Sequence, residues 1–118
     1  MITPTFAQQL TLDCATGQTT GSCEAAITAF CSTITNQVIP PGASTQRCFT
    51  TAAGSKCDFR ARNTDPVNSH NATVQDCESA LSIVSLVCAE GGSGQLTGDA
   101  FQFFGLPNPG ACRNECGN

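Results

Sequence analysis

Nine cysteines in 118 residues constrain the fold of this chain more than any other feature. Such density in a small domain is typical of disulfides formed in an oxidising compartment, so we expect a secreted protein. A metal site is not expected, because no two cysteines have the C-x2-C spacing of structural zinc and His70 is the only histidine. The sequence leaves the pairing, and the fate of the ninth cysteine, open. The eight cysteines expected in disulfides are Cys14, Cys23, Cys31, Cys48, Cys57, Cys77, Cys88 and Cys112.

The length and composition indicate one domain, residues 1–118, with few charges. Only 12% of the residues are charged, and the formal net charge is −4. An acidic chain does not favour nucleic acid or an anionic membrane surface, because both attract a basic face. The longest apolar stretch, residues 81–87, is too short to cross a bilayer, so we expect no membrane insertion. The residues after Met1 form no basic or apolar leader, and we expect the sequence to represent the mature chain.

Hydrophobic periodicity predicts two helices. The first should begin after Ser22 as a cap and end near Asn36. The second should begin at Thr73, three residues before an acidic residue as in a capping box, and stop at residues 91–92, two glycines. The positions expected on the apolar faces of the two helices are Cys23, Ile27, Phe30, Cys31 and Ile34, and then Cys77, Leu81, Val84 and Cys88.

Alternating sequences predict strands at residues 8–14, 47–51, 56–63, 95–97 and 100–104. The second and third are the arms of a hairpin, with Phe49 and Phe59 as its core anchors. Residues 64–71 are expected as a loop and residues 106–118 as a turn-rich tail. The order implies an α+β fold, with two helices packed on a mainly antiparallel sheet and cysteines of the helices bridged to the sheet, to each other or to the tail.

Three of the five basic residues fall in the segment SKCDFRARNT, residues 55–64. As a strand it directs Lys56, Asp58, Arg60 and Arg62 to one side of the sheet and the apolar residues between them to the other. The charged side is either an ordinary solvated surface or a recognition site.

Carbohydrate binding suits such a face, because it needs directional polar side chains on a rigid surface, often beside an aromatic ring. The chain has no Trp or Tyr, so only Phe6 or Phe104 could stack on a sugar. The polar residues expected to point outward from the sheet are Gln9, Thr11, Asp13, Asp58, Arg60, Arg62 and Gln102, with Asn63 at a strand end.

Two other functions are open from the residues. A small secreted ribonuclease could use His70 with a carboxylate such as Asp58 or Glu78 and with Arg60 or Arg62. A disulfide-rich effector could instead act through a protein partner. Asn71-Ala72-Thr73 is an N-glycosylation acceptor pattern, which agrees with secretion.

Four segments in sequence order carry a resemblance to a known family: CEAAITAFCSTI, PPGASTQRCFTTAAGSKCDFRARNT, DCESALSIVSLVC and GGSGQLTGDAFQF. The chain, from about Cys14 to Cys112, resembles the small secreted glycan-binding proteins of basidiomycete mushrooms, the type first described from the ink cap as an antiviral lectin. The resemblance implies a disulfide-bonded αββα-type sandwich that binds glycans without a metal or organic cofactor and forms homodimers by joining sheets edge to edge. Arg62 stands where the family pattern has an aromatic residue.

We therefore expect a secreted, non-enzymatic fungal lectin whose partners are glycans or glycoproteins, with a defence or antiviral role implied by the resemblance. The arginines would donate hydrogen bonds to sugar hydroxyls or to an acidic sugar, and the aspartates would accept from hydroxyls. The expected glycan-binding residues are Asp13, Asp58, Arg60, Arg62, Asn63 and Gln102.

Overall fold

The computed structural model describes residues 9–16, 20–51 and 54–112, which form two helices and seven strands. The helices are α1 (Glu24–Ile34) and α2 (Val74–Val87). The strands are β1 (Leu10–Cys14), β2 (Val38–Ile39), β3 (Ser44–Thr50), β4 (Ser55–Asn63), β5 (His70–Asn71), β6 (Gly92–Leu96) and β7 (Phe101–Pro109).

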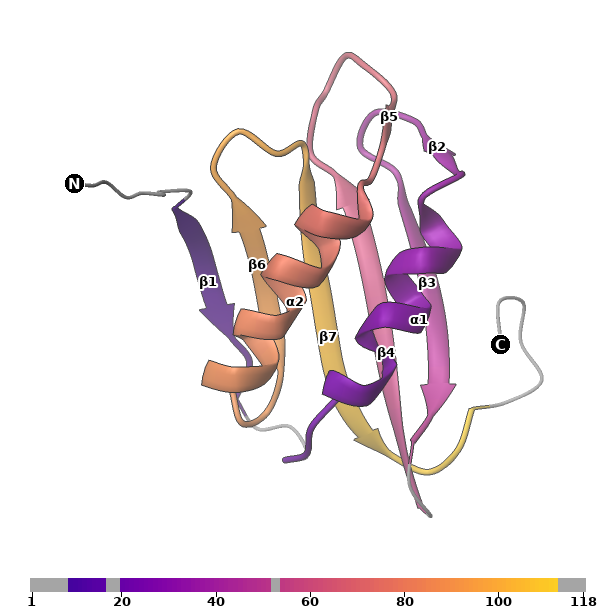
Figure 1. Cartoon of the computed structure of the whole chain (residues 1–118), viewed down its shortest axis with the longest axis vertical. Coiled ribbons are helices and arrows are strands. Elements are labelled where there is room, and N and C mark those ends of the chain that lie inside the picture. Colours follow the sequence, from indigo (N-terminus) through magenta and orange to yellow (C-terminus); the bar gives the residue numbers. More distant parts are fainter. Residues whose placement is uncertain (1–8, 17–19, 52–53, 113–118) are drawn as a thin grey trace.

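Five strands form one sheet in the order β1-β6-β7-β4-β3, and every neighbouring pair is antiparallel. Both helices lie on the same face of this sheet, which gives two layers (Figure 1). In the described part of the chain no helix covers the opposite face, which we call the outward face. The predicted α+β fold, two helices on an antiparallel sheet, is confirmed.

The core fills the space between the helices and the sheet. Every residue predicted on the apolar faces of the helices is buried, and Phe59 of β4 stacks on Phe30 of α1 with ring centroids 4.9 Å apart. Phe49 of β3 meets Phe59 edge to face at 5.8 Å. Burial of each large side chain such as Phe30 stabilises the fold by roughly 1.5–3 kcal/mol.

The helix starts follow local signals. Thr73 is the N-cap of α2, as predicted, and its hydroxyl accepts a hydrogen bond of 3.2 Å from the backbone N–H of Asp76. Ser22 accepts from the backbone N–H of Glu24 at 3.3 Å, but the N-cap position of α1 belongs to the next residue, Cys23. The prediction of the first cap was therefore one residue early.

Four disulfides join the elements, and they use all eight cysteines expected to pair. Cys23–Cys57 links the start of α1 to β4, and Cys31–Cys77 links α1 to α2. Cys14–Cys88 ties β1 to the end of α2, and Cys48–Cys112 ties β3 to the segment after β7. The ninth cysteine, Cys116, lies outside the described residues.

The expectation of a turn-rich tail from residue 106 was wrong, because β7 continues to Pro109 with Pro107 inside it. On the β6 side, β7 is paired only as far as Gly105. Beyond that residue it pairs with β4 alone, so one side of its backbone has no neighbouring strand. Prolines are tolerated where no ladder hydrogen bond is lost.

Two short elements also differ from the prediction. α2 ends at Val87, before the predicted stop at residues 91–92, and β6 begins at Gly92 instead of residue 95. The chain turns sharply between them at Gly91, whose φ of +81° suits glycine. A side chain at Gly91 would also collide with the carbonyl oxygen of Gly105 on β7. The expected loop of residues 64–71 ends in β5, which pairs with β2 in a separate two-stranded sheet.

Candidate functional site

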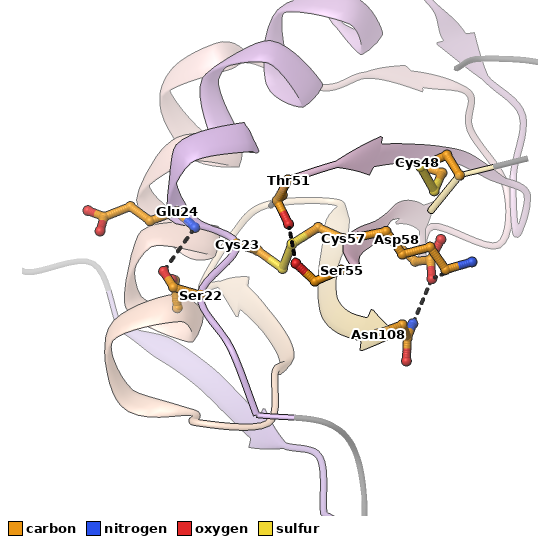
Figure 2. The surroundings of a disulfide bond; sticks show 12 residues. Ser22, Cys23, Glu24, Cys48, Thr51, Ser55, Cys57, Asp58 and Asn108 are labelled. Carbon is orange, nitrogen blue, oxygen red and sulfur yellow. Dashed lines mark hydrogen bonds and ion pairs between the residues drawn. A yellow bond between two sulfur atoms is a disulfide. The ribbon is translucent and has the colours of Figure 1, made fainter. Parts of the chain in front are cut away.

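The outward face is ordered by strand register. On β4 the side chains of Lys56, Asp58, Arg60 and Arg62 point outward, as predicted, while the alternate positions are buried under the helices. Figure 2 shows this alternation at adjacent residues, since Cys57 bonds to Cys23 whereas Asp58 is turned toward Asn108 of β7.

The centre of the outward face is a pair formed by Arg60 of β4 and Phe104 of β7. The two residues are direct cross-strand partners, and the guanidinium carbon of Arg60 lies 4.2 Å from the centroid of the Phe104 ring. Both side chains are half-buried. Arg60 forms no hydrogen bond or ion pair with any residue that the structure describes, so its N–H groups stay available to a ligand.

On one side of the Arg60–Phe104 pair lies an open hollow of about 350 Å³, which we call the larger hollow. In one row across the sheet, Asp13 of β1 faces Ser93 of β6, which faces Phe104, which faces Arg60. Three strand spacings separate Asp13 from Arg60, or about 14 Å between backbones. The larger hollow therefore has a carboxylate at one end, a guanidinium at the other, and a hydroxyl and a ring between them.

On the other side lies a smaller hollow of about 190 Å³, which includes Gln46 of β3, Asp58 of β4 and Leu106 of β7. Asp58 accepts a hydrogen bond of 2.6 Å from Asn108 and lies 3.8 Å from the ammonium nitrogen of Lys56. Arg60, Phe104 and Leu106 line both hollows, so the Arg60–Phe104 pair is the ridge between them.

Arg62 and Gln102 lie one row further along the face, opposite each other on β4 and β7. The Gln102 amide donates to the hydroxyl of Ser93 at 3.1 Å, which fixes it beside the larger hollow. Arg62 is exposed and has no hydrogen-bonding or ionic partner among residues 9–16, 20–51 and 54–112. The structure thus brings five of the six expected binding residues, Asp13, Asp58, Arg60, Arg62 and Gln102, onto one face.

Asn63 is the sixth, and it is not on the outward face. Its side chain is fully buried on the helix side of the sheet, where its amide donates to the carbonyl of Ile39 at 2.9 Å and to that of Asn68 at 2.9 Å. Its own oxygen accepts from the backbone N–H of Asp65 at 2.9 Å. A side chain so enclosed cannot contact a ligand on the other face, and we leave Asn63 out of the candidate site.

Among the residues that line the hollows, Ser93, Leu106 and Gln46 were missed as binding candidates in the sequence. Ser93 lies in a glycine-rich run that resembles a helix stop, and Leu106 lies in the proline-containing part of β7. Gln46 precedes the expected start of its strand, although the alternation of Ser44, Gln46 and Cys48 would have placed it outward. Phe104 was one of the two rings considered for sugar stacking; the other, Phe6, lies outside the described residues.

His70 belongs to a different part of the molecule. Its Nε2 lies 2.8 Å from Oδ2 of Asp65, and its ring contacts Phe101, which points toward the helices. The hydrogen bond with His70, and then those from the backbone N–H groups of Val67 and Asn68, hold the pKa of Asp65 well below its usual range. Arg60 and Arg62 lie on the outward face, whereas His70 lies on the helix side of the sheet. The structure therefore does not place the arginines beside His70, as the ribonuclease alternative requires.

Asp99, in the turn between β6 and β7, is the other carboxyl with a shifted pKa. Burial raises the pKa of Asp99, although one of its oxygens accepts a hydrogen bond from the backbone N–H of Phe101 at 3.2 Å. Its Oδ2 is buried and makes no hydrogen bond to any residue that the structure describes. Asp99 lines neither of the two hollows.

Two further observations concern the described residues as a whole. They contain no group of three or more His, Cys, Asp or Glu side chains placed to hold a metal ion. Neither of their helices is long and apolar enough to span a bilayer.

The outward face offers hydrogen-bond donors and acceptors beside an aromatic ring, in shallow hollows. This combination suits sugar hydroxyls and the apolar side of a sugar ring.

Comparison with known proteins points to the same class of ligand. The chain is 32% identical over 93 residues to the antiviral protein CAP of Coprinus comatus, an alignment that covers 77% of this chain and 91% of that protein. Residues 22–112 match the model of the glycan binding domain Y3 family. The resemblance found in the sequence is thus confirmed, and the chain belongs to the glycan binding domain Y3 family.

Proposed function

We propose that this chain is a secreted fungal lectin whose single domain binds a glycan on the outward face of its sheet. The observation that carries the proposal is the half-buried Arg60–Phe104 pair between two open hollows. Membership of a glycan-binding family supports the ligand class. The four disulfides support secretion, because such bonds persist in oxidising compartments. A defence role is proposed from the antiviral relative.

In the proposed complex, a sugar ring packs on the accessible parts of Phe104 and Leu106. Arg60 and Gln46 donate to its hydroxyls, and Asp13 accepts from hydroxyls at the far end of the larger hollow. Because the two hollows meet at the ridge, an oligosaccharide can place one sugar unit in each. Binding then needs no metal, since the protein side chains themselves supply both donors and acceptors.

A glycan array with matched variants tests the proposal. Phe104→Ala removes the ring but no core contact, so it should lower affinity for every bound glycan by at least about tenfold while the melting temperature changes little. Leu86→Ala is the control, because Leu86 is 82% exposed on α2 and lies on the helix layer. An array without a bound glycan, or equal binding by the two variants, would refute the proposed function or its site.

Two features of the exterior belong to the same proposal. Asn71 lies on β5, in the two-stranded sheet that is separate from the five-stranded one, and we propose that a glycan attached to it leaves the outward face open. β1 and β3 are the edge strands of the sheet, and we propose that a homodimer forms through one of these edges. Sedimentation should give twice the chain mass of 12.2 kDa, and a monomer at micromolar concentration would contradict the dimer.

A further inference from the structure

Charge is unevenly distributed over this acidic protein. Of its five basic side chains, Lys56, Arg60 and Arg62 lie on the outward face, Arg47 lies on the helix side, and Arg113 is outside the described residues. Among the acidic side chains that the structure describes, only Asp13 and Asp58 share the outward face with them. The other described acids lie on the helices or in loops: Glu24, Asp65, Asp76, Glu78, Glu90 and Asp99. The outward face is therefore the cationic side of an anionic molecule.

The two acids of the outward face do not neutralise its arginines. Asp58 is engaged by the Lys56 ammonium at 3.8 Å and by the Asn108 amide at 2.6 Å. Asp13 is three strands away from Arg60, and no ion pair joins them. The cross-strand neighbours of Arg62 are the uncharged Ser44 and Gln102. An anion beside Arg60 and Arg62 would therefore meet no unbalanced negative charge nearby.

Arg60 is also held ready for an anion. Its guanidinium rests on the Phe104 ring at 4.2 Å, which limits its motion, and its N–H groups are unused by the described residues. Arg62 projects from the same strand two residues away, on the same face. A planar guanidinium binds a carboxylate or a sulfate through two parallel hydrogen bonds, and such charge-assisted bonds are stronger than those to a neutral hydroxyl.

We propose that the glycan bound at this face carries an anionic substituent, a carboxylate or a sulfate ester, which Arg60 and Arg62 hold while the sugar ring packs on Phe104 and Leu106. This inference rests on the proposed function and specifies its ligand class. Asp13, at the far end of the larger hollow, accepts a hydrogen bond from a hydroxyl of the adjoining neutral sugar. This contact orients the oligosaccharide so that its anionic substituent points toward β4.

The test compares one oligosaccharide in three forms: neutral, capped with a sialic acid, and sulfated. Titrations at low and physiological salt should show at least one anionic form bound about ten- to a hundredfold more tightly than the neutral form, with the preference falling as salt rises. The sialylated and sulfated forms distinguish a carboxylate from a sulfate ester. Arg60→Gln and Arg62→Gln should each abolish most of that preference, whereas affinity for the neutral form should change much less.

Three variants make the test specific. Arg60→Lys keeps the charge but loses the planar fork, so it should recover only part of the preference. Arg47→Gln removes the same charge on the helix side of the sheet, at a residue that lines neither hollow, and should have a much smaller effect. Asp13→Ala should lower affinity for all three forms, because it removes the acceptor proposed for the adjoining neutral sugar. Equal loss in Arg47→Gln and Arg60→Gln would overturn the inference, because it would reduce the effect to overall charge.

The outcomes also separate this inference from the proposed function. Binding of the neutral form alone, or of all three forms equally, would overturn the anionic ligand while the lectin function stands. Absence of binding to every glycan would overturn both. A single-stranded RNA oligonucleotide of known length is the final competitor, and RNA binding that depends on Arg60 with no glycan binding would assign the face to nucleic acid instead.

Discussion

The amide group of Asn63 holds together segments that are apart in the sequence. From the end of β4 it donates to the carbonyls of Ile39 and Pro40, at 2.9 and 3.3 Å, and to that of Asn68, at 2.9 Å. It also accepts from the backbone N–H of Asp65. Because the side chain is completely buried, water cannot replace these partners. Asn63 thus fixes the chain around β2 and β5 to the end of the hairpin.

Asn63→Ala should therefore destabilise the protein by about 2–4 kcal/mol, since it leaves backbone groups buried without hydrogen bonds. Urea denaturation with the disulfides intact measures the change. Asn68→Ala is the matched control in the same region: the exposed Asn68 side chain makes one hydrogen bond, to Asp65 at 3.3 Å, and its loss should cost below about 1 kcal/mol. Similar stability of the two variants would show that the Asn63 amide is not a structural link.

Some residues of the candidate site could be predicted from the local sequence pattern, and others could not. Asp58, Arg60 and Arg62 were predicted to face outward because a single strand of strict alternation carries them. By the same alternation Asn63 falls on the buried side, but its polar amide led us to expect it at the surface. Its hydrogen-bond partners, which come from distant segments, could not be predicted from the sequence. The hollows themselves could not be predicted, because they depend on long-range strand pairings. The larger hollow needs β6 between β1 and β7, and the smaller one needs β7 beside β4.

At the scale of elements, the helices were predictable because each one carries its own start signal and an apolar stripe. Strand limits were less predictable. β7 reaches Pro109 only because its later half has a partner strand on one side alone, a condition set by where β6 begins. The pair β2 and β5 has two residues in each strand, too few for a periodic pattern to be recognised.

The core and the outward face use alternate residues of the same strands. Inward positions of β4 and β7 carry Cys57, Phe59, Phe101 and Phe103, all buried in the core. Outward positions of the same strands carry Arg60 and Phe104 and line the hollows. A strand can serve both purposes because its side chains alternate between the two faces.

On the scale of the whole molecule, the disulfides divide by accessibility. Cys31 and Cys77 are completely buried between the helices, whereas Cys14, on the edge strand β1, is exposed. Reduction requires a thiolate to reach a sulfur atom, so its rate depends on access. The disulfides therefore provide two kinds of restraint, one open to reductants in the native state and one protected by the fold.

Mild reduction of the native protein should release Cys14–Cys88 before Cys31–Cys77. Timed alkylation followed by peptide mass mapping measures the order. In urea above the unfolding transition the order should disappear, because all four bonds are then equally accessible. Simultaneous release of all four pairs in native buffer would contradict the prediction, since it would mean that reduction proceeds only through global unfolding.

The alternation of inward and outward side chains has a consequence for diversification. Substitutions at Gln46, Ser93 and Leu106 change the shape of the hollows, while the helices, the buried phenylalanines and the four disulfides keep the architecture. The proposed recognition positions are thus separate from the positions that hold the fold. With such a site, a few surface changes can alter sugar specificity while the core is kept.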